Sequence, residues 1–497
     1  MFKILLINPP RDHLVRLDTP KNVDLGEISS FPPIGLMYLA EALRRRDATF
    51  DVRILDAVTA GHGYEAVAAV VSEYQPDVVG LTLFTYTFYD AWRTAGEIKR
   101  THPEIPIVVG GPHMHLFAFE TLAHSCFDYG VVGDGEDVLS DLCEALSRGQ
   151  KPAEARGLIF GGPGRVRGSI EPAEIVNPDA FTIPAIDLID LSKYYSTIGK
   201  RAAVGTICTS RGCPYRCTFC QVPQRRYRMR SASAVVDEME AYISRGVTDF
   251  FFFDDLFNIT TRRAINVCRE ILRRDLDVSW MFRGRADQIN EEMLTVAKRA
   301  GCHTISVGIE AATDEGLTEI NKRLTIDQAF RSVRLIRKHG ISCSTNWIVG
   351  FPHQKTHRDL DYLLSTAIKM DADHAQFSVL QCLPGSALYD QAVDEGGLDP
   401  DAWLNYVRNP VESFSPPIWE KHFTKAELFA FYEKAFRSYY LRPRVVLREL
   451  LKIRGWGELA AKARSFKVVF LNRRGLVPLT HRFRMRSFTR FSRPASA

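Results

Sequence analysis

The sequence lacks any apolar run that approaches the ~20 residues of a membrane-spanning helix. The apolar run near its start, residues 4–7, is too short for a signal peptide and is typical of a buried first strand. Hydrophobic residues make up 45% of the 497 residues and charged residues 25%, which excludes a disordered or collagen-like chain. We therefore expect a cytoplasmic globular protein of roughly two to four domains.

Cysteine is scarce and unevenly placed: of 10 cysteines, three crowd together as Cys213, Cys217 and Cys220. In a reduced compartment such crowding indicates metal ligation or redox chemistry more often than disulfides. The others are scattered and are expected to be ordinary buried residues. They are Cys126, Cys143, Cys208, Cys268, Cys302, Cys343 and Cys382.

No fourth ligand stands near the three clustered cysteines, since the next histidine is His303. A structural zinc ion, the competing interpretation, would normally need a fourth Cys or His at regular spacing. A cubane [4Fe–4S] cluster takes thiolate ligands, and three of them leave one iron without a protein donor. That iron is free to bind a substrate or cofactor, just as catalytic metal sites keep one position open.

Residues 1–150 alternate short apolar runs with helical patterns, which predicts an α/β fold with a parallel, doubly wound sheet. Ligands of such sheets lie at the carboxyl ends of the strands. The expected strands are Ile4–Leu6, Val52–Leu55, Val78–Thr82, Ile107–Val109 and Tyr129–Val132, and the expected helices are Leu36–Arg45, Tyr64–Tyr74, Ala91–Arg100 and Val138–Leu146.

Residues 151–200 contain several prolines and glycines and are expected to form a linker with one hairpin. From 201 to 398 the strand–helix alternation resumes, which predicts a partial or full βα barrel with its active site at the carboxyl ends of the strands. Residues 399–497 are expected to form a helical, basic C-terminal region. The expected barrel strands are Val204–Thr209, Phe250–Asp254, Ser279–Phe282, Thr304–Gly308, Ser344–Val349 and Gln376–Leu380.

The spacing Cys213-x3-Cys217-x2-Cys220, with Phe219 before the third cysteine, is similar to the signature of the radical S-adenosylmethionine superfamily. Later segments resemble the strand motifs of that family in the correct order. The resemblance implies that the open iron binds S-adenosylmethionine, whose reductive cleavage yields a radical that takes hydrogen from a substrate. It also implies an external one-electron donor of the flavodoxin or ferredoxin type. The matching segments are FFFDDLFN at 251–258, GIEAATDEGLTEINKRLT at 308–325, NWIVGFPHQK at 346–355 and LPGSALYDQA at 383–392.

The same resemblance implies contacts with the cofactor. Glu310 would bind the nucleoside or the methionine amine, the alternative being a structural ion pair. Arg283 and Arg285 alternate after a strand, so one should face the barrel and hold the methionine carboxylate, while the other is a solvated charge. Phe219 and Gly350 are also expected at the cofactor.

Asp254 and Asp255, at the end of the second barrel strand, are the predicted catalytic residues. In the family the acids of this motif lie near the bound nucleotide or the substrate. The alternative interpretation is that they cap the following helix, a task that aspartate performs well.

Residues 1–150 resemble the cobalamin-binding domain that is often fused ahead of such a barrel. The matching segments are FPPIGLMYLAEAL at 31–43, VVGLTLFTYTF at 78–88, IVVGGPHMH at 107–115 and VVGDGEDVL at 131–139. Three of them lie just past predicted strands, where a nucleotide-like cofactor would sit. The cobalamin contacts expected from this resemblance are Thr82, Thr85, Gly110, Gly111, Pro112, Gly133, Gly135 and Glu136.

The pattern Asp-x-His-x-x-Gly, with which many cobalamin proteins supply a histidine to cobalt, is absent. His113 and His115 lie on another loop and are not expected to be ligands. The alternative is a vestigial or purely structural doubly wound domain.

The last part of the chain is basic, because residues 437–497 contain 16 lysines and arginines but two acidic residues. The rest of the chain is therefore net negative. Basic residues interleaved with Phe, Val and Leu suit a helix on an anionic membrane surface, which would place the protein at the inner membrane face. A solvated tail and a contact with nucleic acid are the competing interpretations.

These features predict a cobalamin-dependent radical C-methyltransferase that acts on an unactivated carbon of a lipid or other hydrophobic small molecule. One alternative is an oxidative cyclase or hydroxylating enzyme, like the anaerobic ring-forming enzyme of bacteriochlorophyll synthesis. Another is a methylthiotransferase acting on RNA or protein. That class usually has further cysteines in its N-terminal domain, where this chain has only Cys126 and Cys143.

Overall fold

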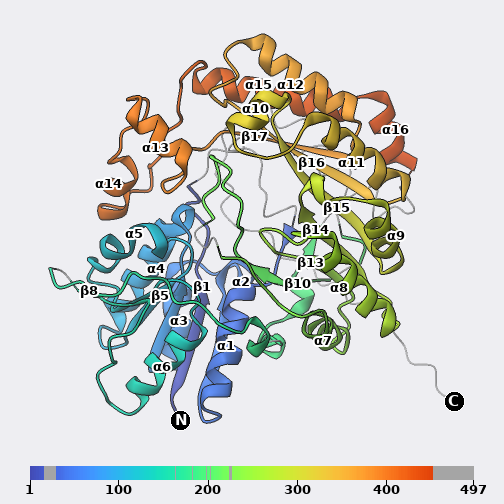
Figure 1. Ribbon diagram of the computed structural model, residues 1–497. Coiled ribbons are helices and arrows are strands. Elements are labelled where there is room, and N and C mark those ends of the chain that lie inside the picture. Colours follow the sequence, from blue (N-terminus) through green and yellow to red (C-terminus); the bar gives the residue numbers. More distant parts are fainter. Residues whose placement is uncertain are drawn as a thin grey trace.

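The computed structural model describes residues 1–15, 29–162, 164–181, 183–196, 199–201, 203–222 and 226–451. They form two α/β units, each built around a sheet of mainly parallel strands (Figure 1). Within these ranges, no helix is long and apolar enough to cross a membrane. Most of the basic segment for which a membrane contact is predicted follows residue 451 and lies outside the described residues.

The first sheet has seven strands in the order β3-β1-β4-β5-β6-β7-β8. Five are parallel, as the doubly wound prediction requires, and the hairpin β7–β8 adds two antiparallel strands at one edge. The sheet thus continues past residue 150, the predicted end of the first domain. Its strands are β1 (Lys3–Asn8), β3 (Asp51–Asp56), β4 (Val78–Thr82), β5 (Ile107–Gly110), β6 (Tyr129–Val131), β7 (Leu158–Phe160) and β8 (Arg167–Gly168).

Helices cover both faces of this sheet because alternate strand residues on both faces are apolar. In β1, Ile4 and Leu6 belong to the core beneath α1 and α6, whereas Leu5 and Ile7 belong to the core beneath α3, α4 and α5. The helices are α1 (Ile34–Arg46), α2 (Ala57–Ala60), α3 (Tyr64–Tyr74), α4 (Phe88–Thr101), α5 (Met114–Leu122) and α6 (Glu136–Ser147).

The second sheet has six parallel strands in chain order, β10-β13-β14-β15-β16-β17. Helices lie on its outer face, where Trp280 and Phe282 of β14 are buried in the main core. The intervening Met281 belongs to a separate small cluster on the opposite, inner face. The strands are β10 (Val204–Ile207), β13 (Asp249–Phe252), β14 (Ser279–Gly284), β15 (Cys302–Glu310), β16 (Ser342–Val349) and β17 (His374–Val379); the helices are α7 (Ala232–Ile243), α8 (Thr261–Arg273), α9 (Glu291–Arg299), α10 (Asp314–Glu319), α11 (Ile326–Lys338) and α12 (His357–Met370).

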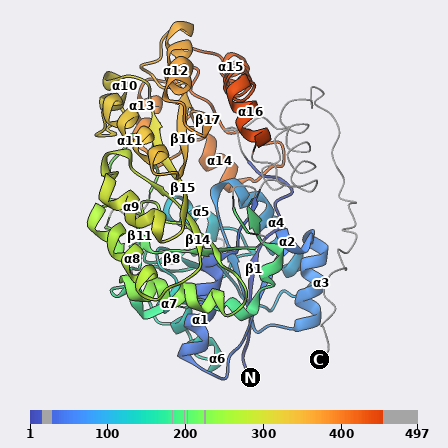
Figure 2. The ribbon, with the colours of Figure 1, turned by 90° about the vertical axis from the view of Figure 1, so that its right-hand side faces the viewer.

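The chain after the last strand returns to both units. After α13 (Ala387–Asp394), helix α14 (Ala402–Arg408) lies beside α5, and α15 (Lys425–Tyr440) with α16 (Pro443–Leu451) runs along the barrel (Figures 1 and 2). His124 bonds the carbonyl of Val407 at 2.7 Å, and the Tyr406 hydroxyl accepts from the Tyr89 amide at 3.2 Å. Elsewhere, a two-residue pairing of β2 (Ser29–Ser30) with β9 (Tyr195–Ser196) joins the segment before α1 to the segment before β10.

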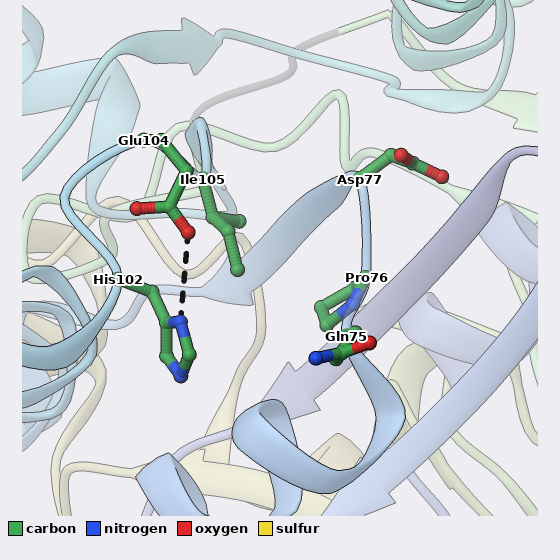
Figure 3. A pocket seen from close by; sticks show the side chains of 6 residues that line it. All are labelled: Gln75, Pro76, Asp77, His102, Glu104 and Ile105. Carbon is green, nitrogen blue, oxygen red and sulfur yellow. Dashed lines mark ion pairs between the residues drawn. The ribbon is translucent and has the colours of Figure 1, made fainter.

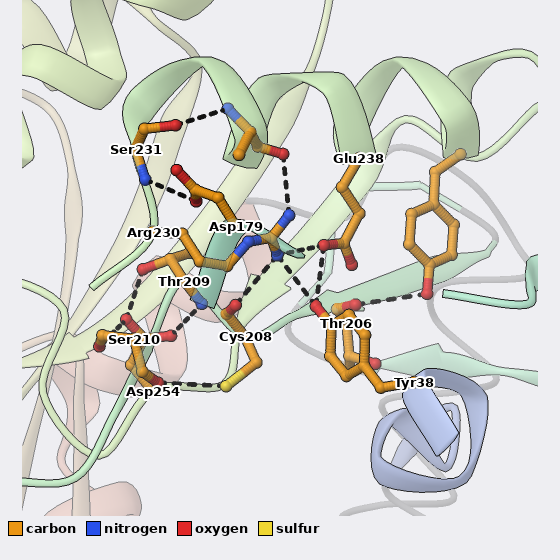
Figure 4. A network of polar contacts seen from close by, with 12 residues as sticks. Tyr38, Asp179, Thr206, Cys208, Thr209, Ser210, Arg230, Ser231, Glu238 and Asp254 are labelled. Carbon is orange, nitrogen blue, oxygen red and sulfur yellow. Dashed lines mark hydrogen bonds and ion pairs between the residues drawn. The ribbon is translucent and has the colours of Figure 1, made fainter. Parts of the chain in front are cut away.

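A buried polar network joins α1 of the first unit to the start of the barrel (Figure 4). Arg230 forms an ion pair with Glu238 of α7, and both side chains are almost inaccessible to water. The Tyr38 hydroxyl donates to Glu238 at 2.8 Å, while Arg230 also donates to the carbonyls of Cys208 and Ala234. Burying two charges is costly unless their remaining hydrogen bonds are satisfied, and these three partners help to satisfy them.

We predict that Arg230→Met destabilises the protein by about 3–5 kcal/mol, because it leaves the buried Glu238 carboxylate unpaired. Tyr38→Phe removes two hydrogen bonds, one donated to Glu238 and one accepted from Arg230, and should cost about 2–3 kcal/mol. Thermal unfolding followed by circular dichroism measures both effects. The matched control is Arg273→Met, since Arg273 pairs with Glu270 at the surface; melting of Arg230→Met at the temperature of this control would contradict the prediction.

Candidate active site

The three clustered cysteines lie on the loop that follows β10, at the carboxyl end of the first barrel strand. A short antiparallel pairing fixes the start of this loop, because β11 (Ser210–Arg211) pairs with β12 (Arg228–Met229). Farther along, the Thr218 amide donates to the carbonyl of Ile320 at 3.1 Å, and the Thr218 carbonyl accepts from the Leu388 amide at 2.9 Å. The loop is therefore held by segments that follow β15 and β17.

Cys213, Cys217 and Cys220 are half-buried free thiols. Burial raises the pKa of Cys220 to about 11, and the neighbouring charges of Cys217 and Cys213 add to that rise. Among the described residues, no three His, Cys, Asp or Glu side chains converge on a point that one metal ion could occupy. A cubane does not need such convergence, because each thiolate binds a different iron, so the donor set fits a cluster better than a zinc ion.

Asp254 holds the backbone just before the cysteine loop (Figure 4). Its buried carboxylate accepts from the Thr209 amide at 2.6 Å and from the Ser210 hydroxyl at 2.6 Å. Arg263 supports the same place by donating to the Thr209 carbonyl at 2.7 Å. The alternative of helix capping is wrong, since Thr260 caps α8. These contacts make Asp254 a positioning residue, and its contact with a substrate stays a prediction.

Arg283 and Arg285 point to different surroundings, as their alternation predicts. Arg285 is buried, ion-paired with Asp287 at 2.8 Å, and lies 3.9 Å above the Tyr215 ring of the cysteine loop. The expectation that the second arginine is a solvated charge is therefore wrong. Arg283 extends from the inner face of β14, where its guanidinium lies over the Phe251 ring.

Glu310 ends β15 in the left-handed backbone region, with a φ of 76°. Such strain in a residue other than glycine is typical of functional sites. The ion pair foreseen as an alternative is present, because Lys322 lies 3.2 Å from the Glu310 carboxylate. A contact of Glu310 with S-adenosylmethionine stays a prediction.

Two features of the neighbouring inner face fit a nucleoside cofactor. A Cβ on Gly308 would lie 2.3 Å from the Glu310 carboxylate, so a larger residue here would displace the Glu310 side chain. The side-chain oxygen of Asn346, paired with Gly308 across the strands, is buried and has no hydrogen-bond partner among the described residues. Such an acceptor is satisfied if a bound group donates to it.

Phe219 and Gly350 lie near each other, as expected for two residues at one cofactor. Phe219 packs edge-on against Phe351 at 5.6 Å, and Lys322 lies 5.8 Å from its ring centre. Gly350 donates its amide to the Gln354 side chain at 2.6 Å. The cysteine loop, β15 and β16 thus converge on one end of the barrel.

The carboxyl edge of the first sheet carries the residues predicted to bind cobalamin. Thr82 ends β4 and Thr85 follows it; Gly110 ends β5, and Gly111 and Pro112 follow. A Cβ on Gly111, which has a φ of 118°, would lie 2.5 Å from a backbone carbonyl oxygen of the β4 loop, so glycine is required for the two loops to meet. The donor-rich edge fits a cobalamin, although direct contacts stay predictions.

His113 is unsuited to bind cobalt. Its ring is fully buried against Phe88, and its two nitrogens bond the hydroxyls of Thr85 and Thr121, each at 3.0 Å. Burial lowers the pKa of His113 to about 3, so the ring stays neutral. Thr85, predicted to contact cobalamin, thus has a side-chain partner inside the protein.

The turn after β6 faces the barrel. Gly133, with a φ of 94°, packs against the Ala173 backbone, and a Cβ there would lie 2.2 Å from the Ala173 carbonyl oxygen. Glu136 forms an ion pair with Arg211, and Gly135 precedes it at the start of α6; their contacts with cobalamin stay predictions.

Arg211 lies two residues before Cys213 and also pairs with Asp134 at 2.8 Å. Asp134 in turn pairs with Arg228 of β12 and accepts from the Ile175 amide at 2.8 Å. This Asp134–Arg211 network was not predicted, because its partners are 77 residues apart and each resembles an ordinary surface charge in the sequence. It places the turn after β6 against the cysteine loop.

A pocket of about 340 Å³ lies away from these residues (Figure 3). Its walls are the segments that precede β4 and β5, including Pro76 and His102, at the amino-terminal edge of the first sheet. Ligands of parallel sheets bind at the opposite edge, so this pocket is not the candidate active site.

Two family descriptions match this chain. Residues 29–143 match the B12 binding domain, and residues 207–363 match the radical SAM superfamily.

An uncharacterised methyltransferase of Pyrococcus horikoshii is 32% identical over 92% of this chain and 96% of its own length. An anaerobic magnesium-protoporphyrin IX monomethyl ester cyclase of Rubrivivax gelatinosus is 30% identical over 74% of this chain and 67% of its own. A hopanoid C-3 methylase of Methylococcus capsulatus is 26% identical over 64% of this chain and 60% of its own.

Solved structures share this fold. The radical S-adenosylmethionine methyltransferase TsrM of Kitasatospora setae, with tryptophan and an S-adenosylmethionine analogue bound, has a TM-score of 0.63 and 25% identity over 80% of this chain and 77% of its own. The same enzyme has been solved with cobalamin and a [4Fe–4S] cluster, with a TM-score of 0.60. The cobalamin-dependent enzyme OxsB shares the fold, with a TM-score of 0.62 and 20% identity over 80% of this chain and 56% of its own.

The predicted cofactors are thereby confirmed as a [4Fe–4S] cluster, S-adenosylmethionine and cobalamin. The near full-length match to the Pyrococcus methyltransferase extends the likeness beyond the two domains. This chain belongs to the cobalamin-dependent radical S-adenosylmethionine enzymes.

Proposed function

We propose that this enzyme transfers a methyl group to an unactivated carbon of a lipid or other hydrophobic small molecule. One observation carries the proposal: loops at the carboxyl ends of both sheets touch each other. Arg211 of the cysteine loop pairs with Asp134 after β6, and Phe31 of the first unit packs on Phe251 inside the barrel. Cofactors bound at these two edges would lie next to each other.

When bound, the cluster and S-adenosylmethionine supply a radical that removes hydrogen, and cobalamin supplies a methyl group. The chain positions these reagents. The Asp134–Arg211 network fixes the cysteine loop against the first sheet, and Asp254 fixes its entry from β10. Arg285 and Lys322 draw the loop toward β14 and β15.

An apolar substrate is supported by the inner face of the barrel. Phe253 keeps 45% of its surface exposed there, beside Phe251 and Phe31. One relative, the hopanoid C-3 methylase, is named for a lipid substrate. We also propose that a small electron donor reduces the cluster. The basic tail would make a peripheral membrane contact through residues that lie outside those described.

The cysteine assignment predicts that replacing Cys213, Cys217 and Cys220 together by Ala abolishes iron binding and 5′-deoxyadenosine formation. The reconstituted native protein should hold about four irons per chain. Iron analysis and chromatography of the reaction measure the two quantities. Cys382→Ala is the matched control, because this thiol is buried among apolar residues and should leave the cluster intact. A cluster retained by the triple variant would contradict the assignment.

For cobalamin, we predict binding without a histidine ligand to cobalt, because both ring nitrogens of His113 are already hydrogen-bonded. Electron paramagnetic resonance of the cob(II)alamin form should show no nitrogen splitting from a lower protein ligand. His115→Phe should leave the spectrum unchanged. A nitrogen splitting that disappears in either His113→Gln or His115→Phe would show that the residue is a ligand.

Methyl transfer predicts that S-adenosylhomocysteine and 5′-deoxyadenosine form in equal amounts per product, since one S-adenosylmethionine gives its methyl and another gives the radical. The full chain, reconstituted with both cofactors and reductant, is incubated with lipid extracts and methyl-labelled S-adenosylmethionine. Mass spectrometry should find a product in which a labelled methyl replaces hydrogen. Product formed with 5′-deoxyadenosine but without S-adenosylhomocysteine would favour the cyclase or hydroxylating alternative.

A further inference from the structure

The inner face of the barrel is divided into a tightly packed part and a part that water reaches. Val204, Phe251 and Met281 form a small buried cluster on three adjacent strands, and Phe31 of the first unit packs against it. One step toward the carboxyl ends, the side chains of Phe253, Asp255 and Arg283 are exposed. The water-accessible part therefore lies between the apolar cluster and the cysteine loop.

Three aromatic rings in mutual contact, Phe31, Phe251 and Phe253, form what we call the phenylalanine patch; Phe253 is exposed, Phe31 is half-buried, and Phe251 is buried beneath them. Phe31 lies 5.2 Å from Phe251 and 6.4 Å from Phe253, and the last two lie 5.4 Å apart. Covering the exposed ring of Phe253 and the accessible part of Phe31 with an apolar group is favourable. The patch is thus suited to hold the apolar body of a ligand.

Arg283 is placed over this patch. Its guanidinium carbon lies 5.1 Å from the ring centre of Phe251 and 5.7 Å from that of Phe253, both within cation–π range. Among the described residues, no hydrogen bond or ion pair to the guanidinium is present, so its donors are available. Arg285, two residues later, instead bonds Asp287 and the carbonyls of Lys322 and Arg323.

The surroundings of Arg283 strengthen the interaction between its guanidinium and a bound anion. The rings of Phe251 and Phe253 cover one side of the Arg283 guanidinium, water reaches the rest of the side chain, and partial desolvation lowers its pKa. In such a low-dielectric place a charge-assisted hydrogen bond is stronger than at the outer surface. The charge of Asp255 raises the pKa of Arg283, but Asp255 lies outside ion-pair distance and does not occupy the donors of the guanidinium.

We propose that Arg283 and the phenylalanine patch form a subsite for a substrate that joins an oxyanion, a carboxylate or a phosphate, to an apolar body. The guanidinium would take the oxyanion and the rings would hold the adjoining apolar part. The inference rests on the proposed function, whose substrate class it narrows from hydrophobic molecules to anionic amphiphiles. It also reassigns Arg283, which was predicted to hold the methionine carboxylate of S-adenosylmethionine.

The test measures binding to the full chain reconstituted with its cluster, cobalamin and S-adenosylmethionine, without reductant. The probes share one ring system: 1-naphthoate, 1-naphthyl phosphate and the neutral 1-naphthylmethanol. The native enzyme should bind at least one anion about tenfold more tightly than the alcohol, which corresponds to about 1.4 kcal/mol. The preferred anion identifies the source of the oxyanion. Arg283→Met should bring all three dissociation constants within about twofold, and Arg283→Lys should keep part of the preference.

Arg93→Met is the matched control, because Arg93 lies 5.4 Å from the Tyr64 ring centre on the outer surface of α4 and should not affect the probes. Equal binding of anions and alcohol by the native enzyme would overturn the proposal, as would a preference that survives in Arg283→Met. Loss of S-adenosylmethionine affinity in Arg283→Met, with the probe preference unchanged, would assign Arg283 to the cofactor instead. Because the assay involves no turnover, its result is independent of whether methyl transfer occurs.

Discussion

The arrangement of the two units depends on one buried ion-pair network, in which Asp134 lies between Arg211 and Arg228. Asp134 and its neighbour Glu136 belong to the turn at the carboxyl edge of the first sheet, whereas both arginines belong to the strands that flank the cysteine loop. Desolvating these charges costs several kcal/mol per ion, and only accurate geometry offsets that cost. The network therefore stabilises one relative placement of the cysteine loop and the first sheet. A purely apolar contact is less directional and would allow the two to slide past each other.

Other contacts reinforce that placement without duplicating it. Tyr38 of α1 reaches the Arg230–Glu238 pair at the outer side of β10, and the chain after β17 returns so that Val407 and Tyr406 contact α4 and the segment after α5. The first sheet is thus held from two directions. An enzyme that uses two cofactors on separate sheets needs this rigidity, because a displacement of about 1 Å can cost two orders of magnitude in rate.

The sequence predicts most elements well because their signals are local. The helix Tyr64–Tyr74 and the strand Val78–Thr82 have the predicted bounds, since apolar periodicity and flanking turn residues define both. The site is only partly predictable. Spacing identified the cysteines, but the role of Asp254 depends on Thr209 and Ser210 across the sheet, 45 and 44 residues away. Arg285 resembles a surface charge in the sequence, yet Asp287 and Tyr215 bury it.

Arg283 in β14 and Arg285 just after it have different roles, one facing a ligand site and one holding the scaffold. Arg285 donates hydrogen bonds to Asp287 and to the carbonyls after α10. Its guanidinium also packs on Tyr215 and so holds the cysteine loop. Arg283 faces the inner side with aromatic rings beneath it and no carboxylate in contact among the described residues. A guanidinium kept over apolar rings, when Asp255 stands nearby and could have neutralised it, is preorganised for an incoming anion. Affinity there would come from interactions that the protein has already oriented, so little ordering is required when the ligand arrives.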